Sequence, residues 1–406
     1  MRTVHRVITL FVVIVTLYLG TTGTLIQLVD LRSLLGHAPA TDVNMEALRE
    51  GGNGPGAFQV ISDPDYSAAV LPSDLKLETS FAKVLNTASK VAGNAALGYV
   101  EMRMIDGKPV GQIKADRQLL RFDAVTGDAI PGSFAETKIN QSPDSLRNTV
   151  KRLHRMTAIG NWTLWINVVA GTALLVLIVT GLWMYFQLYS ARARVRAHPT
   201  GLFWSAGGRW RSLHRWISLC AAVFLLVVAL SGTWLAVESL GFGIYMASHP
   251  PRPRAVSAPR TPLPDGITAL NEAVIPAMLS TTLASFKTSM PNTSMRVLRL
   301  RVYGGMPQGV IVTGNSEAAQ VVFNATSGRR ANQTEPGYPE VGFPFGWQAH
   351  QIAKQIHRGD YIGLSGRWMD LLAGLSMVFL SISAAIMYFN MWSKRRQTGR
   401  RGLIWK

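Results

Sequence analysis

Four histidines in this sequence are each followed directly by an arginine. They are His5-Arg6, His154-Arg155, His214-Arg215 and His357-Arg358, four of eight histidines, where chance predicts about 0.6. A neutral imidazole offers a nitrogen lone pair to a metal, and two facing imidazoles supply the axial ligands of a six-coordinate haem. The adjacent guanidinium groups suit haem propionates, because arginine binds a carboxylate through two hydrogen bonds. The pattern therefore predicts ligation of haem iron.

Each pair stands at the start of a long apolar stretch. The stretches lie near residues 7–29, 159–188, 216–237 and 369–392. Each is long enough for the roughly 20 residues that cross a bilayer as a helix. The first stretch also has features of a signal peptide, but no A-x-A cleavage site follows it, which favours a membrane anchor. Four transmembrane helices are expected, within segments 1–29, 154–188, 214–237 and 357–392.

The positive charge of the chain, formally +18, is concentrated beside these stretches. Arginine and lysine crowd the loop 189–213 and the tail 393–406. Such clusters mark the cytoplasmic side of a membrane rather than a nucleic-acid surface. Both termini are then cytoplasmic, and segments 30–153 and 238–356 lie on the opposite side. The single cysteine, Cys220, excludes an internal disulfide and is expected to be buried in helix packing.

The two halves of the chain follow one plan. A helix at 78–91 and a hairpin at 99–113 correspond to a helix at 267–279 and a hairpin at 297–312. Thr22-Gly23-Thr24 follows His5 at the offset at which Ser231-Gly232-Thr233 follows His214. The expected fold is a membrane bundle of four transmembrane helices with two outer α+β domains. A pseudo-two-fold axis along the membrane normal would relate the halves.

This symmetry predicts how the histidines pair. His5 would face His214 near the inner side of the membrane, and His154 would face His357 near the outer side, with one haem for each pair. Two alternatives remain open. In one, the arginines serve only as interfacial anchors. In the other, the histidines bind zinc, although no Cys, Asp or Glu is spaced to complete a tetrahedral site. His350, two helical turns before His357, is an alternative ligand.

An aromatic stretch before the fourth apolar segment is the candidate contact for a substrate. It includes Tyr338, Phe345 and Trp347, with His350 close behind. The same outer segment is rich in arginine: Arg296, Arg299, Arg301, Arg329 and Arg330. Aromatic rings with scattered arginines suit a bulky anionic ligand. The other interpretation is that the rings form an interfacial belt and the arginines a solvated strand face.

These features resemble the PepSY-associated transmembrane family over nearly the whole chain. The resemblance rests on LHRM at 153–156, LHRW at 213–216, IHRGDYIGLSGRW at 356–368, and hairpins closed by DAVTG and NATSG. It implies PepSY-like periplasmic domains at 30–153 and 238–356 in a protein of the bacterial inner membrane. Members include haem proteins that reduce ferric siderophores, which implies that His5, His154, His214 and His357 carry the haems. Some relatives have Thr where this chain has Arg358.

The expected function is electron transfer across the membrane through two haems b to a ferric siderophore or another ferric chelate in the periplasm, for iron acquisition. The haems would be held without covalent bonds, since no C-x-x-C-H motif is present. No dinucleotide motif appears, so electrons would come from a cytoplasmic protein, a soluble reductant or a quinol. The alternatives are a PepSY-domain sensor that regulates peptidases and a non-catalytic subunit of an uptake complex.

Overall fold

A computed structural model describes most of the chain as two compact units. The described residues are 2–39, 42–52, 66–93, 95–116, 118–134, 145–195, 201–248, 270–303, 306–315, 318–331, 346–399 and 402–404. The helical unit comprises Met1–Arg32, Leu146–Pro250 and Val341–Lys406, and the sheet unit comprises Ser33–Ser145 and Pro251–Glu340.

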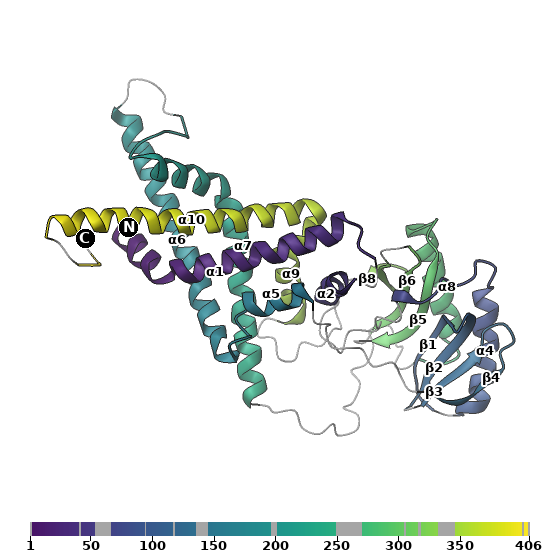
Figure 1. The fold of residues 1–406 in the computed structure, drawn as a ribbon. Coiled ribbons are helices and arrows are strands. Elements are labelled where there is room, and N and C mark those ends of the chain that lie inside the picture. The colour runs from purple at the N-terminus through teal and green to yellow at the C-terminus, as the bar shows by residue number, and fades with distance from the viewer. Residues whose placement is uncertain are drawn as a thin grey trace. The chain divides into compact units, whose positions relative to one another are not determined.

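The helical unit contains the four apolar stretches as long helices (Figure 1). They are α1 (Arg2–Leu35), α6 (Leu164–Val195), α7 (Arg209–Ser248) and α10 (Gly363–Gln397). Each belongs to a segment that is long and apolar enough to cross a membrane. Helix α7 packs against α6 and α10, and α1 approaches α10 where the hydroxyls of Thr16 and Ser381 lie 3.1 Å apart. The chain is therefore a multi-pass membrane protein, as expected.

Many apolar side chains of these helices are exposed, as suits contact with lipid. Ile14 is 78% exposed and Val223 68% exposed. Cys220 is also exposed on α7, so the expectation that it is buried is wrong. The buried side of this part of α7 is formed by Ala221 and Leu225, which pack with residues of α6 and α10. Cys220 lies on a different side of the same helix.

Two of the four histidines do not begin a span. His154 ends the short helix α5 (Leu146–His154), and His357 ends α9 (Trp347–His357). Backbone with positive φ follows at Gly160 and Gly359. The single-turn 3₁₀ helices η2 (Asn161–Thr163) and η3 (Asp360–Ile362) then lead into α6 and α10. Continuous helices from 154 and from 357 were the wrong expectation, because glycine readily adopts the positive φ that interrupts an α-helix.

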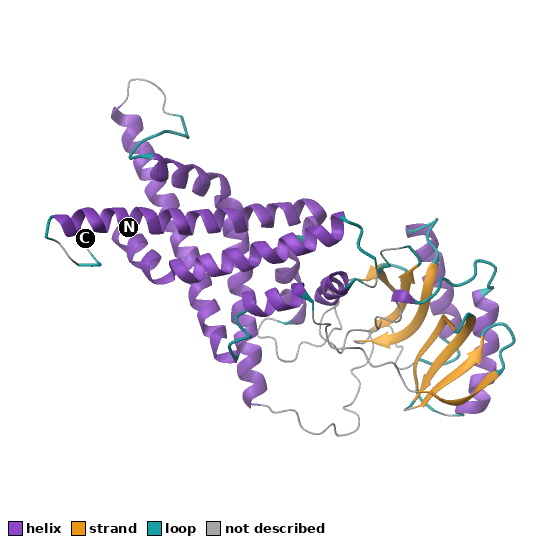
Figure 2. Ribbon diagram, viewed as in Figure 1, coloured by secondary structure: helices purple, strands orange, loops and turns teal. Residues whose placement is uncertain are grey.

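The sheet unit is built around one antiparallel sheet of eight strands (Figure 2). The first half supplies β1 (Leu97–Ile105), β2 (Lys108–Ala115), β3 (Gln118–Asp123) and β4 (Ala129–Phe134). The second half supplies β5 (Met295–Tyr303), β6 (Met306–Thr313), β7 (Gln320–Asn324) and β8 (Arg330–Ala331). The strand order is β4-β3-β2-β1-β5-β6-β7-β8.

The two outer segments were expected as separate domains, but the structure joins them through β1 and β5. These strands pair antiparallel, with Val100 opposite Leu300. The pairing satisfies two strand edges that separate domains would leave open, and an open edge invites aggregation. The physical reason for one sheet is therefore the hydrogen bonding of these inner edges.

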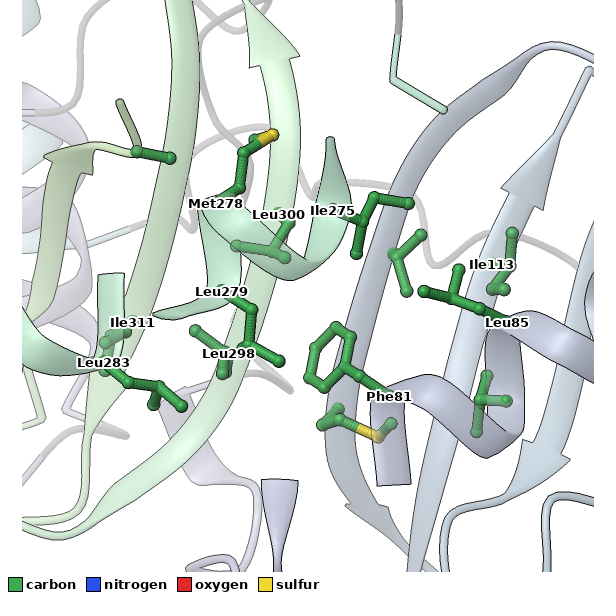
Figure 3. Packing of buried hydrophobic residues seen from close by; sticks show 14 of the residues in the cluster. Phe81, Leu85, Ile113, Ile275, Met278, Leu279, Leu283, Leu298, Leu300 and Ile311 are labelled. Atoms are coloured by element: carbon green, nitrogen blue, oxygen red, sulfur yellow. The ribbon is translucent and has the colours of Figure 1, made fainter. Parts of the chain in front are cut away.

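Two helices, α4 (Leu77–Ala92) and α8 (Ile275–Ser289), carry the apolar side chains that cover the sheet. A shorter helix, α2 (Val43–Gly52), precedes them in the chain. Figure 3 shows side chains of both helices and of the strands gathered into one cluster. Phe81 of α4, Ile275 of α8 and Leu298 of β5 are each at most 1% exposed. Because burial of apolar surface drives folding, the shared core makes the two halves stabilise each other.

The predicted local elements of the sheet unit are largely present. The helix expected at 78–91 matches α4, and both hairpins form. Asp106 and Gly107 turn the first hairpin with φ of 49° and 75°, and the second turn at 304–305 lies outside the described residues. Helix α8 begins later than expected, because the Asn271 side chain accepts hydrogen bonds from the N–H groups of Ala273 and Val274 in a turn before it.

Candidate functional site

His154 and His357 lie side by side in the helical unit. Their ring centroids are 6.3 Å apart, and the ring planes are inclined at 34°. Each histidine is the last residue of a short helix, α5 or α9. Because a break follows each short helix, neither ring belongs to the long helix that comes next in the chain.

A hydroxyl group on a neighbouring span lies at the Nδ1 atom of each of these rings. Thr22 Oγ1 of α1 is 2.9 Å from Nδ1 of His154. Ser231 Oγ of α7 is 3.3 Å from Nδ1 of His357. The carbonyl oxygen of Val228, also on α7, is 3.2 Å from the same nitrogen of His357. Both rings are thus held through Nδ1.

His5 and His214 form a second group, on α1 and α7. Nδ1 of His5 is 2.9 Å from Thr180 Oγ1 of α6, and Nδ1 of His214 is 2.7 Å from Ser383 Oγ of α10. The two imidazoles lie close enough for a charge on one to act on the other. All four Nδ1 atoms therefore have the same kind of partner.

The hydroxyl groups determine which ring nitrogen carries a hydrogen. Each donates its only hydrogen to a carbonyl about one turn back in its own helix: Thr22 to Tyr18 at 2.8 Å, Thr180 to Val176 at 2.7 Å, Ser231 to Val227 at 2.7 Å and Ser383 to Leu380 at 3.1 Å. With that hydrogen engaged, the hydroxyl oxygen is available to accept from the imidazole, which assigns the donor role to Nδ1. In this tautomer Nε2 of each ring keeps its lone pair, which is the state that a metal requires.

Glycine follows the hydroxyl residue where His154 and His357 approach the spans. A Cβ atom at Gly23 would lie 3.3 Å from Cε1 of His154, and one at Gly232 would lie 2.9 Å from Cε1 of His357. The second distance is shorter than side chains tolerate, so residue 232 has to be glycine for the ring to stay in place. The repeated Thr-Gly and Ser-Gly pairs thus provide an acceptor and the space beside it.

The separation of the His154 and His357 rings is compatible with two imidazoles that would hold one metal ion between them. A metal–imidazole bond of about 2.0 Å and a ring radius of about 1.1 Å put the centres of two axial rings about 6.2 Å apart. The observed separation is 6.3 Å. Among the described residues there is no group of three or more His, Cys, Asp or Glu side chains that could hold a metal ion. Haem iron would need only two protein ligands, so a pair of imidazoles would be enough to hold it.

The sequence matches the family described as PepSY-associated TM region over residues 2–390. The chain belongs to this family. No curated protein matches the sequence. In this PepSY-associated protein the matched region includes all four histidines and both hairpins.

Two of the four hydroxyl partners, Thr22 and Ser231, are indicated by the repeat in the sequence. The other two, Thr180 and Ser383, were not predicted. The signal was present, because Thr180 follows His154 by the 26 residues by which Ser383 follows His357. A single hydroxyl inside an apolar stretch, by contrast, is common in membrane helices and indicates little by itself.

Arg215 holds a loop in this PepSY-associated protein. Its guanidinium donates to the carbonyl oxygens of Trp204 at 3.1 Å and Ala206 at 3.0 Å. It also lies over the Trp204 ring, 5.1 Å from the centroid. The segment between α6 and α7 is thereby tied to the start of α7, close to His214.

The other three arginines that follow the histidines have different surroundings. Arg358 pairs with Asp360, with 3.1 Å between Nε and Oδ2. Arg155 is exposed, and Nε of Arg6 lies 3.4 Å from the carbonyl oxygen of Arg2. One common role was expected for the four arginines, but they do not share one set of contacts.

Basic side chains also surround Lys354, which lies on α9 one turn before His357. The charges that act on it belong to Arg358, Lys151, Arg147 and Arg155. Burial, together with the neighbouring Arg358, lowers the pKa of Lys354 well below its usual range. A bound carboxylate would relieve this repulsion, because it would bring a negative charge to a site where cations predominate.

His350 has a different partner from His357. Its Nδ1 atom lies 2.6 Å from Oε2 of Glu238, a fully buried residue of α7. The ring close to His154 is that of His357. Of the two candidates for a ligand on α9, the geometry therefore favours His357.

The residues expected to contact a substrate are only partly described. Tyr338 and Phe345 lie outside the described residues, and Trp347 is the first residue of α9. Arg329 and Arg330 are exposed on the sheet unit. These positions stay candidates for substrate contact.

Two of the arginines in the sheet unit have structural roles. Arg299 pairs with the buried Glu101 at 2.6 Å, and Arg301 donates to Gln308 at 2.9 Å. Both arginines are 8% exposed. The interpretation that they belong to a solvated strand face is therefore wrong, because their guanidinium groups are buried in a polar network on the sheet.

Proposed function

We propose that this protein carries electrons through two haems b to ferric siderophores or other ferric chelates. His5 and His214 would hold one haem, and His154 and His357 the other. A pseudo-two-fold axis would relate the two halves. The proposal rests on one observation above all: Nδ1 of each of the four imidazoles lies 2.7–3.3 Å from a hydroxyl oxygen, an arrangement that assigns the free lone pair to Nε2.

The residues around each pair of rings would have distinct roles. A haem with two axial histidines supplies one-electron transfer and has no open iron position. The hydroxyl groups of Thr22, Thr180, Ser231 and Ser383 would hold the tautomer and the ring orientation. Lys354 and Arg155 offer cations to the propionates at the His154/His357 end. The apolar helices keep water away from the rings.

Placement of the basic side chains favours a bacterial inner-membrane protein with both termini in the cytoplasm. Exposed Arg194 and Arg211 flank the loop between α6 and α7, and Lys394 to Arg396 end α10. Such residues favour the cytoplasmic side. A fluorescent reporter fused after Lys406 should therefore be active, and a periplasmic phosphatase at the same position inactive. The opposite result would exclude this orientation.

Reduction would release iron from a chelate because Fe(II) binds hard oxygen ligands more weakly than Fe(III). In this step one electron passes from the protein to the bound Fe(III), and no atom is transferred. We expect dithionite-reduced protein to be reoxidised by ferric hydroxamate or catecholate chelates under anaerobic conditions, as followed by the haem spectrum. The matched gallium(III) chelates should leave it reduced, since gallium(III) accepts no electron here. If no ferric chelate reoxidises the protein, the proposal fails and a sensor or scaffold remains.

A comparison of two serines on α10 tests the role of the hydroxyl groups. Ser383→Ala removes the acceptor at Nδ1 of His214, so we expect haem affinity at this site to fall about 10-fold or more. Ser381→Ala serves as the matched control, because Ser381 is also buried on α10 but contacts Thr16. Haem transfer to excess apomyoglobin measures the affinity. Equal haem loss from the two variants would contradict a specific role for Ser383.

A further inference from the structure

Glu238 is a buried carboxylate with one oxygen that has no partner among the described residues. The residue is 0% exposed on α7. Its Oε2 atom lies 2.6 Å from Nδ1 of His350, whereas Oε1 is buried without a hydrogen-bond partner. Burying a carboxylate oxygen without a donor is costly. A donor from a ligand would remove that cost.

The next residue of α9 has an unused donor. Gln351 is 1% exposed, and its Nε2 atom has no hydrogen-bond partner among the described residues. Helices α7 and α9 pack against each other. An open acceptor on α7 and, on α9, an open donor next in sequence to the imidazole that contacts Glu238 thus belong to two helices that pack together. A molecule with a hydroxyl group and an oxygen acceptor would match these two atoms.

The equivalent position in the first half is closed. Arg147 precedes His154 by the seven residues by which His350 precedes His357. Arg147 binds Asp30 through two hydrogen bonds, of 2.6 and 3.1 Å, and Arg367 contacts the same carboxylate. Both oxygens of Asp30 are therefore paired. Among the described residues, the carboxylate that faces Arg147 in the first half is thus closed, whereas the carboxylate that faces His350 in the second half is open.

Aromatic rings flank Glu238 along α7. Trp234 and Phe242 lie four residues before and four residues after it, so they share its side of the helix. They are 40% and 38% exposed on a helix that can span a membrane. A ligand with an aromatic ring could approach here from the lipid. A buried carboxylate repels anions, which disfavours a ferric chelate of negative charge or a lipid phosphate.

We propose that Glu238, His350 and Gln351 bind a lipid-soluble hydroquinone, which is the electron donor. One phenolic hydroxyl group would donate to Oε1 of Glu238, and Gln351 would donate to an oxygen of the ligand. The inference deepens the proposed function and rests on it for the destination of the electrons.

The chemistry balances for a hydroquinone. Its oxidation to the quinone releases two electrons and two protons. Glu238 accepts the first proton as the phenolic O–H bond breaks, and the side chain of His350, 16% exposed, leads protons towards solvent. The second proton leaves after the first by the same route. The two electrons would pass one to each of the two haems of the proposed function. His350 lies about 10 Å along α9 from His357, at about 1.5 Å per residue.

Photolabelling tests the site in the full-length protein, held in phospholipid nanodiscs. An azido-quinone with a decyl chain should label α7 near Glu238 or the start of α9, and decylubiquinol should compete with it. Glu238→Gln and Gln351→Leu should each raise the decylubiquinol concentration that is needed to prevent labelling. For Glu238→Gln the rise should be about 10-fold or more, because a hydrogen bond to a charged group is lost. Gln355→Leu is the control: it makes the same substitution at a half-buried position of α9 and should leave the decylubiquinol concentration needed for competition unchanged. Gln351→Leu keeps the Glu238–His350 pair and decides the matter if Glu238→Gln does not fold.

The outcomes separate this site from the proposed function. Absence of label on both helices, or competition in both site variants at the wild-type concentration, would exclude the hydroquinone site. Labelling that is retained in a protein that no ferric chelate reoxidises would support the site and exclude ferric reduction. Reoxidation by ferric chelates without labelling would support ferric reduction and exclude the hydroquinone site.

Discussion

Replacement of His154 or His357 by alanine is expected to remove one of two haems and to leave the other in place. Each axial position needs an imidazole lone pair, and the two rings lie 6.3 Å apart as a pair. His5→Ala or His214→Ala should remove the other haem. The visible spectrum of the purified protein, with haem counted by extraction, should fall by about half in each single variant and to nothing in the variant that lacks all four.

His350→Ala is the matched control for His357→Ala. Both residues lie on α9, but His350 contacts Glu238 rather than His154. The control should keep both haems. Full haem absorbance in the variant that lacks all four histidines would disprove ligation by these residues. Loss of haem from His350→Ala, together with its retention in His357→Ala, would instead identify His350 as the ligand.

Asp30→Ala is expected to cause the largest loss of stability in the helical unit. Asp30 is 1% exposed and pairs with Arg147 and Arg367, which are 3% and 2% exposed. Removal of the carboxylate leaves two buried guanidinium groups without their common partner. Breaking a buried ion pair in this way costs about 3–5 kcal/mol. The thermal unfolding midpoint of the detergent-solubilised protein should fall accordingly.

A compensating variant distinguishes the charge effect from a loss of packing. Asp30→Ala combined with Arg147→Met and Arg367→Met removes the charges together, so it should recover much of the lost stability, because apolar replacements of a buried network are often neutral. Arg194→Met, at an exposed position, should change little. If the triple variant is as unstable as Asp30→Ala, the ion network is not the cause.

The sequence predicted those elements whose signals are local. Apolar length predicted the four spans, and period-two alternation with Asp106-Gly107 predicted the first hairpin. The four His-Arg pairs identified the four histidines that the structure arranges in two groups. These signals work because helix periodicity, strand alternation and turn chemistry depend on residues that are close in the chain. Helix ends were less predictable, as the breaks at Gly160 and Gly359 show.

Only the tertiary structure decided which side chains meet across the bundle. The partner of His5 lies 175 residues away, at Thr180, and that of His214 lies 169 residues away, at Ser383. The sequence placed a histidine at 350 but did not indicate that Glu238 would hold it. Such contacts depend on how whole helices pack, and no local pattern contains that information. The pairing of β1 with β5 is of the same kind, because strands far apart in the chain join only when their free edges meet.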